Sequence, residues 1–133
     1  MDHAKVLAAG IDNFFLQLNA HSLSGVMDGI AENGVMRIPS SNFVYDGKDA
    51  IEVHLDDFLK TFKIVNFRDF KPAADPINRR LAVHFNVSLT DHDGEATHMS
   101  NANFFEMNED GKLTDILIFA SAPLSKGFEA GSS

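Results

Sequence analysis

The fold of this chain is decided by residues 80–90, RLAVHFNVSLT, in which apolar and polar side chains alternate most regularly. The apolar set is Leu81, Val83, Phe85, Val87 and Leu89. In a β-strand successive side chains point to opposite faces, so a period of two predicts a strand whose two faces differ. The segment therefore predicts a sheet, and its neighbours decide what kind.

Two short polar segments that end in glycine, residues 91–94 and 108–111, follow this strand. Polar segments of this type between alternating stretches are typical of β-hairpin turns. They predict an antiparallel meander, in which residues 80–90 pair with a second strand and that strand pairs with a third, residues 113–121.

The chain before this meander is expected to be mainly helical, because apolar side chains recur there every three or four residues. The expected helices cover residues 3–20, a short segment that Ser22 caps and that stops at residues 33–34, and residues 48–62. The expected strands cover residues 35–38, ended by Pro39, and residues 63–71, interrupted by residues 72–76, PAADP, with a loop over 40–47 between them. This order indicates one α+β domain, residues 1–123, followed by a flexible tail, residues 124–133.

The composition narrows the classes of partner. The 133 residues carry a formal net charge of −8, which disfavours nucleic acid and anionic membranes. The chain has 12 Phe, one Tyr and no Trp. Its aromatic side chains are therefore almost all apolar, as expected for a hydrophobic core or the wall of a hydrophobic cavity. Without Cys it can form no disulfide or thiolate metal site. It shows no signal sequence and no apolar run of ~20 residues, so a cytoplasmic location is expected.

The lengths of the two hairpin turns decide which side chains share a face of the sheet. Taken as two-residue turns at residues 92–93 and 109–110, they place His84 opposite Asn101 and Asn101 opposite Ile118. One predicted face then holds His84, Asn86, Ser88, Met99, Asn101, Asn103, Phe105, Ile116, Ile118 and Ala120. The other holds Leu81, Val83, Phe85, Val87, Leu89, Ala102, Phe104, Leu117 and Phe119, with His98 and Ser100. Alternation alone favours packing of the second, more apolar face on the helices.

Four short motifs, in this order, resemble one family. They are residues 18–27, LNAHSLSGVM; 31–36, AENGVM; 45–51, YDGKDAI; and 108–113, NEDGKL. They are similar to the helix, turn and hairpin motifs of the SnoaL-like (nuclear transport factor-like) superfamily, over nearly the whole chain. The resemblance implies a cone-shaped, curved mixed or antiparallel sheet wrapped against three N-terminal helices. It also implies that the face with His84 and Asn101 lines a concave pocket and that the convex face forms a homodimer.

Two branches of the superfamily offer comparisons for the site. Ketosteroid isomerases carry a Tyr, a base Asp and an acidic Asp at positions that here hold Phe14, Ile38 and Asn103, so steroid isomerisation is not expected. Scytalone dehydratase is more similar, because His84 lies on the strand of one of its histidines. Asn101 and Asn103 match the Ser-x-Asn pair of that enzyme.

These comparisons imply a set of site residues. His84 is the expected proton-transfer residue, and Asn101 and Asn103 are expected to hold a substrate oxygen. The other expected ligand contacts are Phe14, Ile38, Phe58, Asn66, Asn86, Ser88, Met99, Phe105, Ile116 and Ile118, with Asn66 matched to a second histidine of scytalone dehydratase. The alternative is that the polar members only satisfy one another as a buried network. No metal or organic cofactor is expected, since His54 and two nearby aspartates are interpreted as a solvated helix face.

Three functions remain open on the sequence. The first is a cofactor-independent dehydratase or isomerase that acts on a cyclic, oxygenated, mostly apolar substrate. The second is a non-catalytic module that binds an apolar ligand. The third is an accessory homodimer whose convex sheet docks a protein partner.

Overall fold

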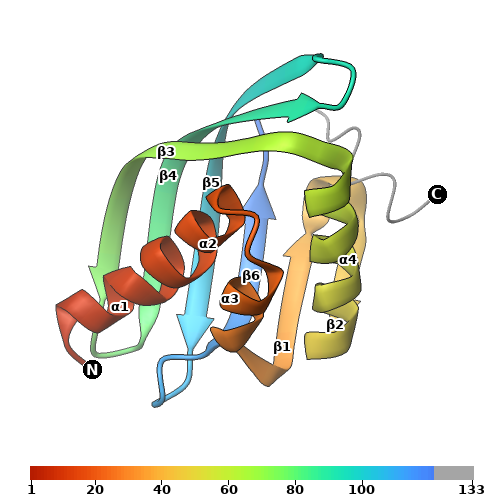
Figure 1. Cartoon of the computed structure of the whole chain (residues 1–133). Coiled ribbons are helices and arrows are strands. Elements are labelled where there is room, and N and C mark those ends of the chain that lie inside the picture. The colour runs from red at the N-terminus through yellow and green to blue at the C-terminus, as the bar shows by residue number, and fades with distance from the viewer. Residues whose placement is uncertain (122–133) are drawn as a thin grey trace.

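The computed structural model, which describes residues 1–121, has the helices first and the sheet after them (Figure 1). The helical elements are α1 (His3–Gly10), a π turn (Ile11–Phe15), α2 (Leu16–Asn19), α3 (Leu23–Asp28), a 3-10 turn (Pro39–Ser41) and α4 (Lys48–Thr61). The strands are β1 (Ile30–Ile38), β2 (Phe43–Asp46), β3 (Phe62–Asp75), β4 (Arg80–Asp91), β5 (Ala96–Met107) and β6 (Leu113–Phe119). The predicted α+β fold is confirmed, and the predicted flexible tail, residues 124–133, lies outside the described residues.

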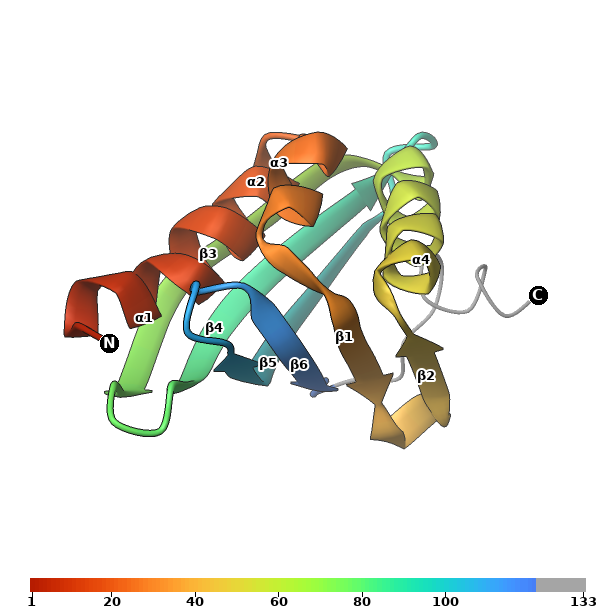
Figure 2. The same ribbon diagram turned by 90° about the horizontal axis from the view of Figure 1, so that it is seen from below.

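The strands form one mixed sheet in the order β2-β1-β6-β5-β4-β3. Only the β1–β6 pair is parallel among the strand pairs of residues 1–121. The sheet curves, and all four helices lie on its concave side, with α1 to α3 over β3 to β6 and α4 beside β1 and β2 (Figure 2). This side is called the inner face below, and the opposite side the outer face.

The first helix is interrupted by a π turn that changes which side chains it buries. Within this turn the neighbouring residues Phe14 and Phe15 are both buried, with 2% and 0% of their surface exposed. Phe15 packs on Phe85 and Phe67, with ring centroids 4.6 and 5.0 Å away. The extra residue of a π turn advances the helix by one position, so adjacent side chains can both reach the sheet.

Three predictions about the strands are wrong. β1 begins at Ile30, within the segment predicted to complete the second helix, and not at Val35. Residues 40–47 are not only loop, because they include β2, which pairs with β1. β3 does not stop at Pro72 but continues to Asp75, with Pro72 opposite Val83. Proline is tolerated on an edge strand, whose outward N–H has no partner to lose, and β3 is an edge strand. The strand bends instead at a bulge, where Asp69 has φ 57°.

The first hairpin turn is one residue longer than predicted, and this changes the face of every β4 side chain. Asp91 and Glu95 close the loop through a 3.0 Å backbone hydrogen bond, which leaves three residues between them. The third, Gly94, has φ 85°, as a three-residue hairpin requires. His84 is therefore opposite Ala102 rather than Asn101. Side chains alternate between the two faces of a strand. One additional residue in the turn therefore places each β4 side chain on the opposite face from the one predicted relative to β5.

The second hairpin keeps its predicted faces. Asn103 is opposite Ile118 rather than Ile116, a shift of two residues that leaves both side chains on the same side. The inner face consequently combines the apolar set of β4 with the alternate set of β5 and β6 that contains Asn101 and Asn103. Together with the helices it forms one hydrophobic core.

Candidate ligand cavity

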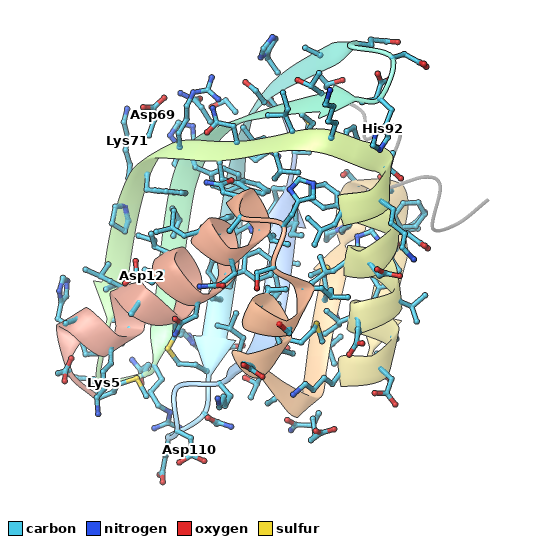
Figure 3. All side chains as sticks on the ribbon, in the orientation of Figure 1. Lys5, Asp12, Asp69, Lys71, His92 and Asp110 are labelled. Carbon is cyan, nitrogen blue, oxygen red and sulfur yellow. The ribbon has the colours of Figure 1, made fainter. Side chains whose placement is uncertain are left out.

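A small cavity of about 30 Å³ lies within this core, between the helices and the inner face. It is lined by Phe14, Leu18, Met36, His54, Leu55, Phe58, Phe67, Phe85, Asn101, Asn103 and Ile118. Side chains fill the rest of the space between helices and sheet, whereas charged side chains such as Asp12, Lys71 and Asp110 point away from it (Figure 3). The volume is room for about one or two water molecules.

Two neighbouring asparagines of β5 reach into this cavity. Asn101 and Asn103 are 5% and 2% exposed. Asn101 is held by the backbone, because the N–H of Ser121 donates to its Oδ1 over 3.0 Å. The Oδ1 atom of Asn103 has no hydrogen-bond partner among residues 1–121. A buried acceptor left in this state costs about 1–3 kcal/mol, a cost that a hydrogen-bond donor placed in the cavity would remove.

His54 on α4 supplies the third polar group. Its side chain is 2% exposed, and burial lowers its pKa from 6.5 to about 4, an effect that the nearby Asp57 carboxylate opposes only in part. The imidazole is therefore uncharged at neutral pH. A neutral imidazole has one nitrogen that donates and one that accepts, so it can pass a proton or polarise a carbonyl.

Tyr45 on β2 stands against this imidazole. The two rings are stacked with centroids 4.1 Å apart and an interplanar angle of 19°. The Tyr45 hydroxyl is buried and has no hydrogen-bond partner within the described part of the chain. Burial, followed by the charge of Asp57, raises the pKa of Tyr45, so its phenol stays protonated. The stack fixes the plane of the His54 ring at the cavity wall.

The prediction that His84 shares a face with the two asparagines is wrong. His84 is exposed on the outer face, where its Nε2 lies 2.7 Å from the hydroxyl of Ser100. Asn86 and Ser88 follow it to that face, where they bond to Asp69 and to His98. The cause is the three-residue turn, which reverses β4 against β5.

The other predicted contacts divide by position. Phe14, Phe58 and Ile118 line the cavity. Buried in the surrounding core are Ile38, Met99, Phe105 and Ile116. The predicted contact Asn66 is exposed and pairs with Ser88 on the outer side of the edge strand, away from the cavity.

His54 lines the cavity although the sequence did not predict it, and the interpretation of a solvated helix face is wrong for this residue, which is buried. A signal was present. The apolar stripe of α4 contains Ile51, Leu55 and Phe58, and position 54 follows Ile51 by three residues on the same stripe. A polar residue on a buried stripe is more informative than the acidic residues beside it.

Among residues 1–121, no group of three or more His, Asp or Glu side chains is close enough to hold a metal ion. No helix of this part of the chain has the length and apolar character to cross a bilayer.

Comparison with known proteins identifies the family. The family model of the SnoaL-like domain matches residues 11–116. The chain belongs to this SnoaL-like family. No curated protein matches the sequence. Solved structures with low sequence identity to this chain share its fold.

Three solved structures illustrate this. AusH from Aspergillus nidulans is 16% identical, with 96% of this chain and 90% of that chain covered and a TM-score of 0.78. SalBIII, an epoxide hydrolase/cyclase-like enzyme in pyran ring formation in the polyether salinomycin, is 16% identical, with coverages of 90% and 93% and a TM-score of 0.79. BvnE pinacolase from Penicillium brevicompactum is 16% identical, with coverages of 90% and 84% and a TM-score of 0.77.

Proposed function

We propose that the cavity binds a compact, mostly apolar, cyclic molecule carrying an oxygen and acts on it as a lyase or isomerase through side chains of the chain itself. The observation that carries this proposal is the convergence of His54, Asn101 and Asn103 in a wall that is otherwise apolar. Apolar walls with a few convergent polar groups are typical of small-molecule sites. The names of SalBIII and BvnE, an epoxide hydrolase/cyclase-like enzyme and a pinacolase, support chemistry of this kind for the fold.

In this proposal the roles differ from those assigned to His84. Asn103 accepts a hydrogen bond from a hydroxyl of the substrate at its Oδ1, which has no partner among residues 1–121. His54 transfers the proton or polarises the substrate oxygen, because it is buried, uncharged and fixed against Tyr45. Asn101 keeps the shape of the wall, because its own oxygen is already bonded to the backbone.

The volume restricts how a ligand enters. About 30 Å³ is far below the roughly 300–1,000 Å³ of typical ligand sites, so side chains must move when a ring binds. Met36 lines the cavity and has three rotatable bonds, which makes it the wall residue that can change rotamer at least cost. We infer that Met36 gives way to the ring.

A second function, a binding module without catalysis, is favoured by one specific observation. No carboxylate of residues 1–121 lines the cavity, and a histidine whose pKa is about 4 is a weak base at neutral pH. Such a site can hold an oxygenated ring without abstracting a proton from it.

An exchange experiment separates the two functions. Cyclic hydroxyketones such as 2-hydroxycyclohexanone and 4-hydroxycyclohexanone, whose hydroxyl can donate to Asn103 Oδ1, are screened for binding by thermal shift, and the hits are incubated with the protein in D₂O. An enzyme that transfers protons accelerates deuterium uptake next to the carbonyl, whereas a binding module does not. His54→Phe should abolish this uptake and retain binding, because Phe keeps the ring.

Matched variants test whether the cavity is the site. Asn103→Leu should lose binding of the hydroxyketone hits, and His84→Ala, on the outer face, should not. The proposal fails if His84→Ala removes binding while Asn103→Leu leaves it intact. It also fails if neither variant changes the binding of any hit.

A further inference from the structure

The Tyr45 side chain directs its polar end into the protein. Tyr45 lies on β2, an edge strand, and its side chain is half-buried, yet its hydroxyl is buried and has no hydrogen-bond partner from any residue up to Ser121. A tyrosine at the rim of a sheet usually packs its ring on the core and keeps its hydroxyl in water. An unbonded hydroxyl inside the protein is unfavourable, so the packing of the core alone does not account for this orientation.

Tyr45 stands directly behind the wall of the cavity. Met36 and His54 both line the cavity, whereas Tyr45 does not. The register of β1 and β2 pairs Tyr45 with Met36, and paired side chains share a face with Cβ atoms about 4.5–5.5 Å apart. The Tyr45 ring also stacks on His54 with centroids 4.1 Å apart. Met36 and His54 therefore form the layer that separates Tyr45 from the cavity.

Met36 is the member of this layer that can move. Methionine has three rotatable bonds and carries no charge or polar hydrogen that needs a partner. His54, in contrast, is a flat ring held in the stack with Tyr45. A rotamer change of Met36 would therefore join the space at the Tyr45 hydroxyl to the cavity of about 30 Å³.

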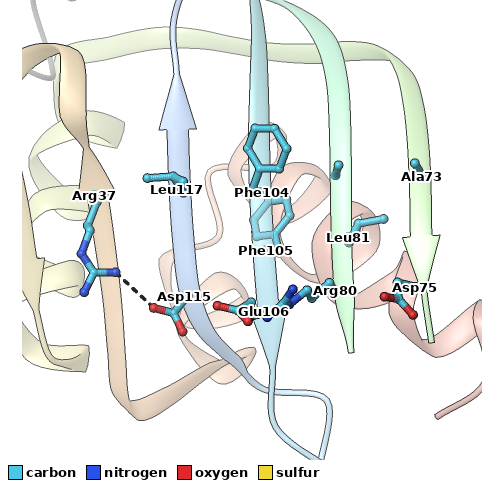
Figure 4. A pocket seen from close by; sticks show the side chains of 11 residues that line it. Arg37, Ala73, Asp75, Arg80, Leu81, Phe104, Phe105, Glu106, Asp115 and Leu117 are labelled. Carbon is cyan, nitrogen blue, oxygen red and sulfur yellow. Dashed lines mark hydrogen bonds and ion pairs between the residues drawn. The ribbon is translucent and has the colours of Figure 1, made fainter. Parts of the chain in front are cut away.

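A groove of about 560 Å³ on the outer face of the sheet does not offer the same chemistry (Figure 4). Four of its charged side chains are already paired, since Arg37 Nη1 lies 3.1 Å from Asp115 Oδ1 and Arg80 Nε donates to Glu106 over 2.9 Å. An uncharged ligand would have to compete with these ion pairs for its hydrogen bonds. The Tyr45 hydroxyl has no partner to lose, which favours the inner side of the sheet for a neutral ring.

We propose that Tyr45 closes a latent extension of the cavity, and that its hydroxyl donates to a carbonyl oxygen of the ligand once Met36 turns aside. This inference rests on the proposed function, because it takes the cavity to be the ligand site. Asn103 Oδ1 accepts from a hydroxyl at the other end of the same molecule. One donor and one acceptor at the two ends of an apolar space select cyclic hydroxyketones as the ligand class.

The strand order sets the spacing of the two ligand oxygens. Asn103 on β5 is opposite Ile118 on β6, and Ile116 on β6 is opposite Met36 on β1, which pairs with Tyr45 on β2. Tyr45 is thus three strands from Asn103, about 14 Å at ~4.8 Å per strand. Both side chains reach inward over the curved sheet and shorten this gap. A hydroxyl and a carbonyl on opposite sides of a ring bridge the remainder better than the same groups on adjacent carbons.

Affinity measurements with a pair of ligands test the Tyr45 hydrogen bond. The pair is 4-hydroxycyclohexanone and 4-methylenecyclohexanol, in which a CH₂ group replaces the carbonyl oxygen at nearly the same shape. Tyr45→Phe should weaken binding of the ketone about tenfold and leave binding of the alkene unchanged. Val44→Ala, at the exposed neighbouring position of β2, should bind both as wild type does. The wild type should also prefer 4-hydroxycyclohexanone to 2-hydroxycyclohexanone, and Tyr45→Phe should lose this preference.

The absorption of tyrosine reports on the same bond directly. The chain has one Tyr and no Trp, so its near-ultraviolet tyrosine band belongs to Tyr45. A phenol that donates to a carbonyl absorbs at longer wavelength, so 4-hydroxycyclohexanone should shift the band and 4-methylenecyclohexanol should not. Met36→Ile should lose the shift, because a β-branched side chain is stiff and cannot turn aside. Met107→Ile, buried elsewhere on β5, should keep it.

The outcomes separate this inference from the proposed function. If Asn103→Leu loses the ketone but Tyr45→Phe binds it as wild type does, the role of Tyr45 is overturned and the cavity remains the site. An unshifted tyrosine band in the wild type saturated with ketone has the same meaning. If neither variant changes the affinity for the ketone, the proposed function is overturned together with this inference.

Discussion

The buried imidazole of His54 should make the stability of the protein depend on pH in a defined window. The folded state holds the His54 pKa at about 4, against 6.5 for an unperturbed histidine. As the pH falls, the unfolded chain therefore takes up the proton first, and the folded state is disfavoured. The contribution of His54 to stability is fully present above pH 6.5, is lost as the pH falls towards 4, and changes no further below 4.

The size of the effect follows from the same two values. The difference between 6.5 and about 4 corresponds to about 3.4 kcal/mol at 1.36 kcal/mol per pKa unit. At pH 5, between the two values, about 2 kcal/mol of this should already be lost. Since domains are stabilised by only about 5–15 kcal/mol, this loss is measurable by denaturation.

The assay is urea unfolding of the wild type and of His54→Phe at pH 7.5, 6 and 5. Phe retains an aromatic ring against Tyr45 and cannot be protonated, so the variant keeps the packing and lacks the titration. The free energy of unfolding of the wild type should fall by about 2 kcal/mol more than that of the variant between pH 7.5 and 5. His3→Phe, at an exposed position of α1, controls for the introduction of a phenylalanine.

Parallel curves for the wild type and His54→Phe would refute the reasoning. They would mean that the imidazole gains its proton in the folded and unfolded states alike, and that the cavity is wet enough to solvate a charge. A direct titration of the His54 ring protons by NMR gives the same decision, because a midpoint near 6.5 would contradict the burial of the ring.

Three further substitutions test the packing and the turn by urea unfolding. Asn103→Leu should leave stability unchanged or raise it by about 1 kcal/mol, because it removes an unbonded buried oxygen, and a loss above about 2 kcal/mol would contradict this. Gly10→Ala should cost about 1–3 kcal/mol, since its Cβ would lie 2.5 Å from the Leu81 side chain and 3.2 Å from the Phe105 ring. Gly94→Ala should cost about 1–2 kcal/mol for another reason, as its Cβ meets nothing within 4 Å and only the φ of 85° is strained; no loss here would argue against the three-residue turn.

Much of the fold was determined by local sequence. The apolar stripes predicted the helices, and the α4 stripe from Ile51 to Phe58 is buried as expected. The alternation of residues 80–90 predicted β4, and the two glycine-containing segments predicted both hairpins. These features depend on residues close together in the chain, so their periodicity is enough to identify them.

The face on which each β4 side chain lies depends on the length of the turn after β4, which the alternation of residues 80–90 does not determine. The turn after β4 has three residues because Asp91 Oδ1 accepts hydrogen bonds from the N–H groups of Asp93 and Glu95, and Gly94 takes the left-handed conformation. A two-residue turn would also have been compatible with the sequence. One residue in that loop decides whether His84 lies in the cavity or in solvent.

Only the tertiary structure decided the candidate site. A sequence shows that His54 lies on the stripe of α4, but not that the stripe faces two asparagines from a strand some fifty residues later. It shows Pro72, but not that β3 is an edge strand where proline costs no ladder hydrogen bond. Periodicity is a property of neighbours in the chain. Burial, strand order and register are properties of the assembled sheet, and these brought His54, Asn101 and Asn103 together while turning His84 away.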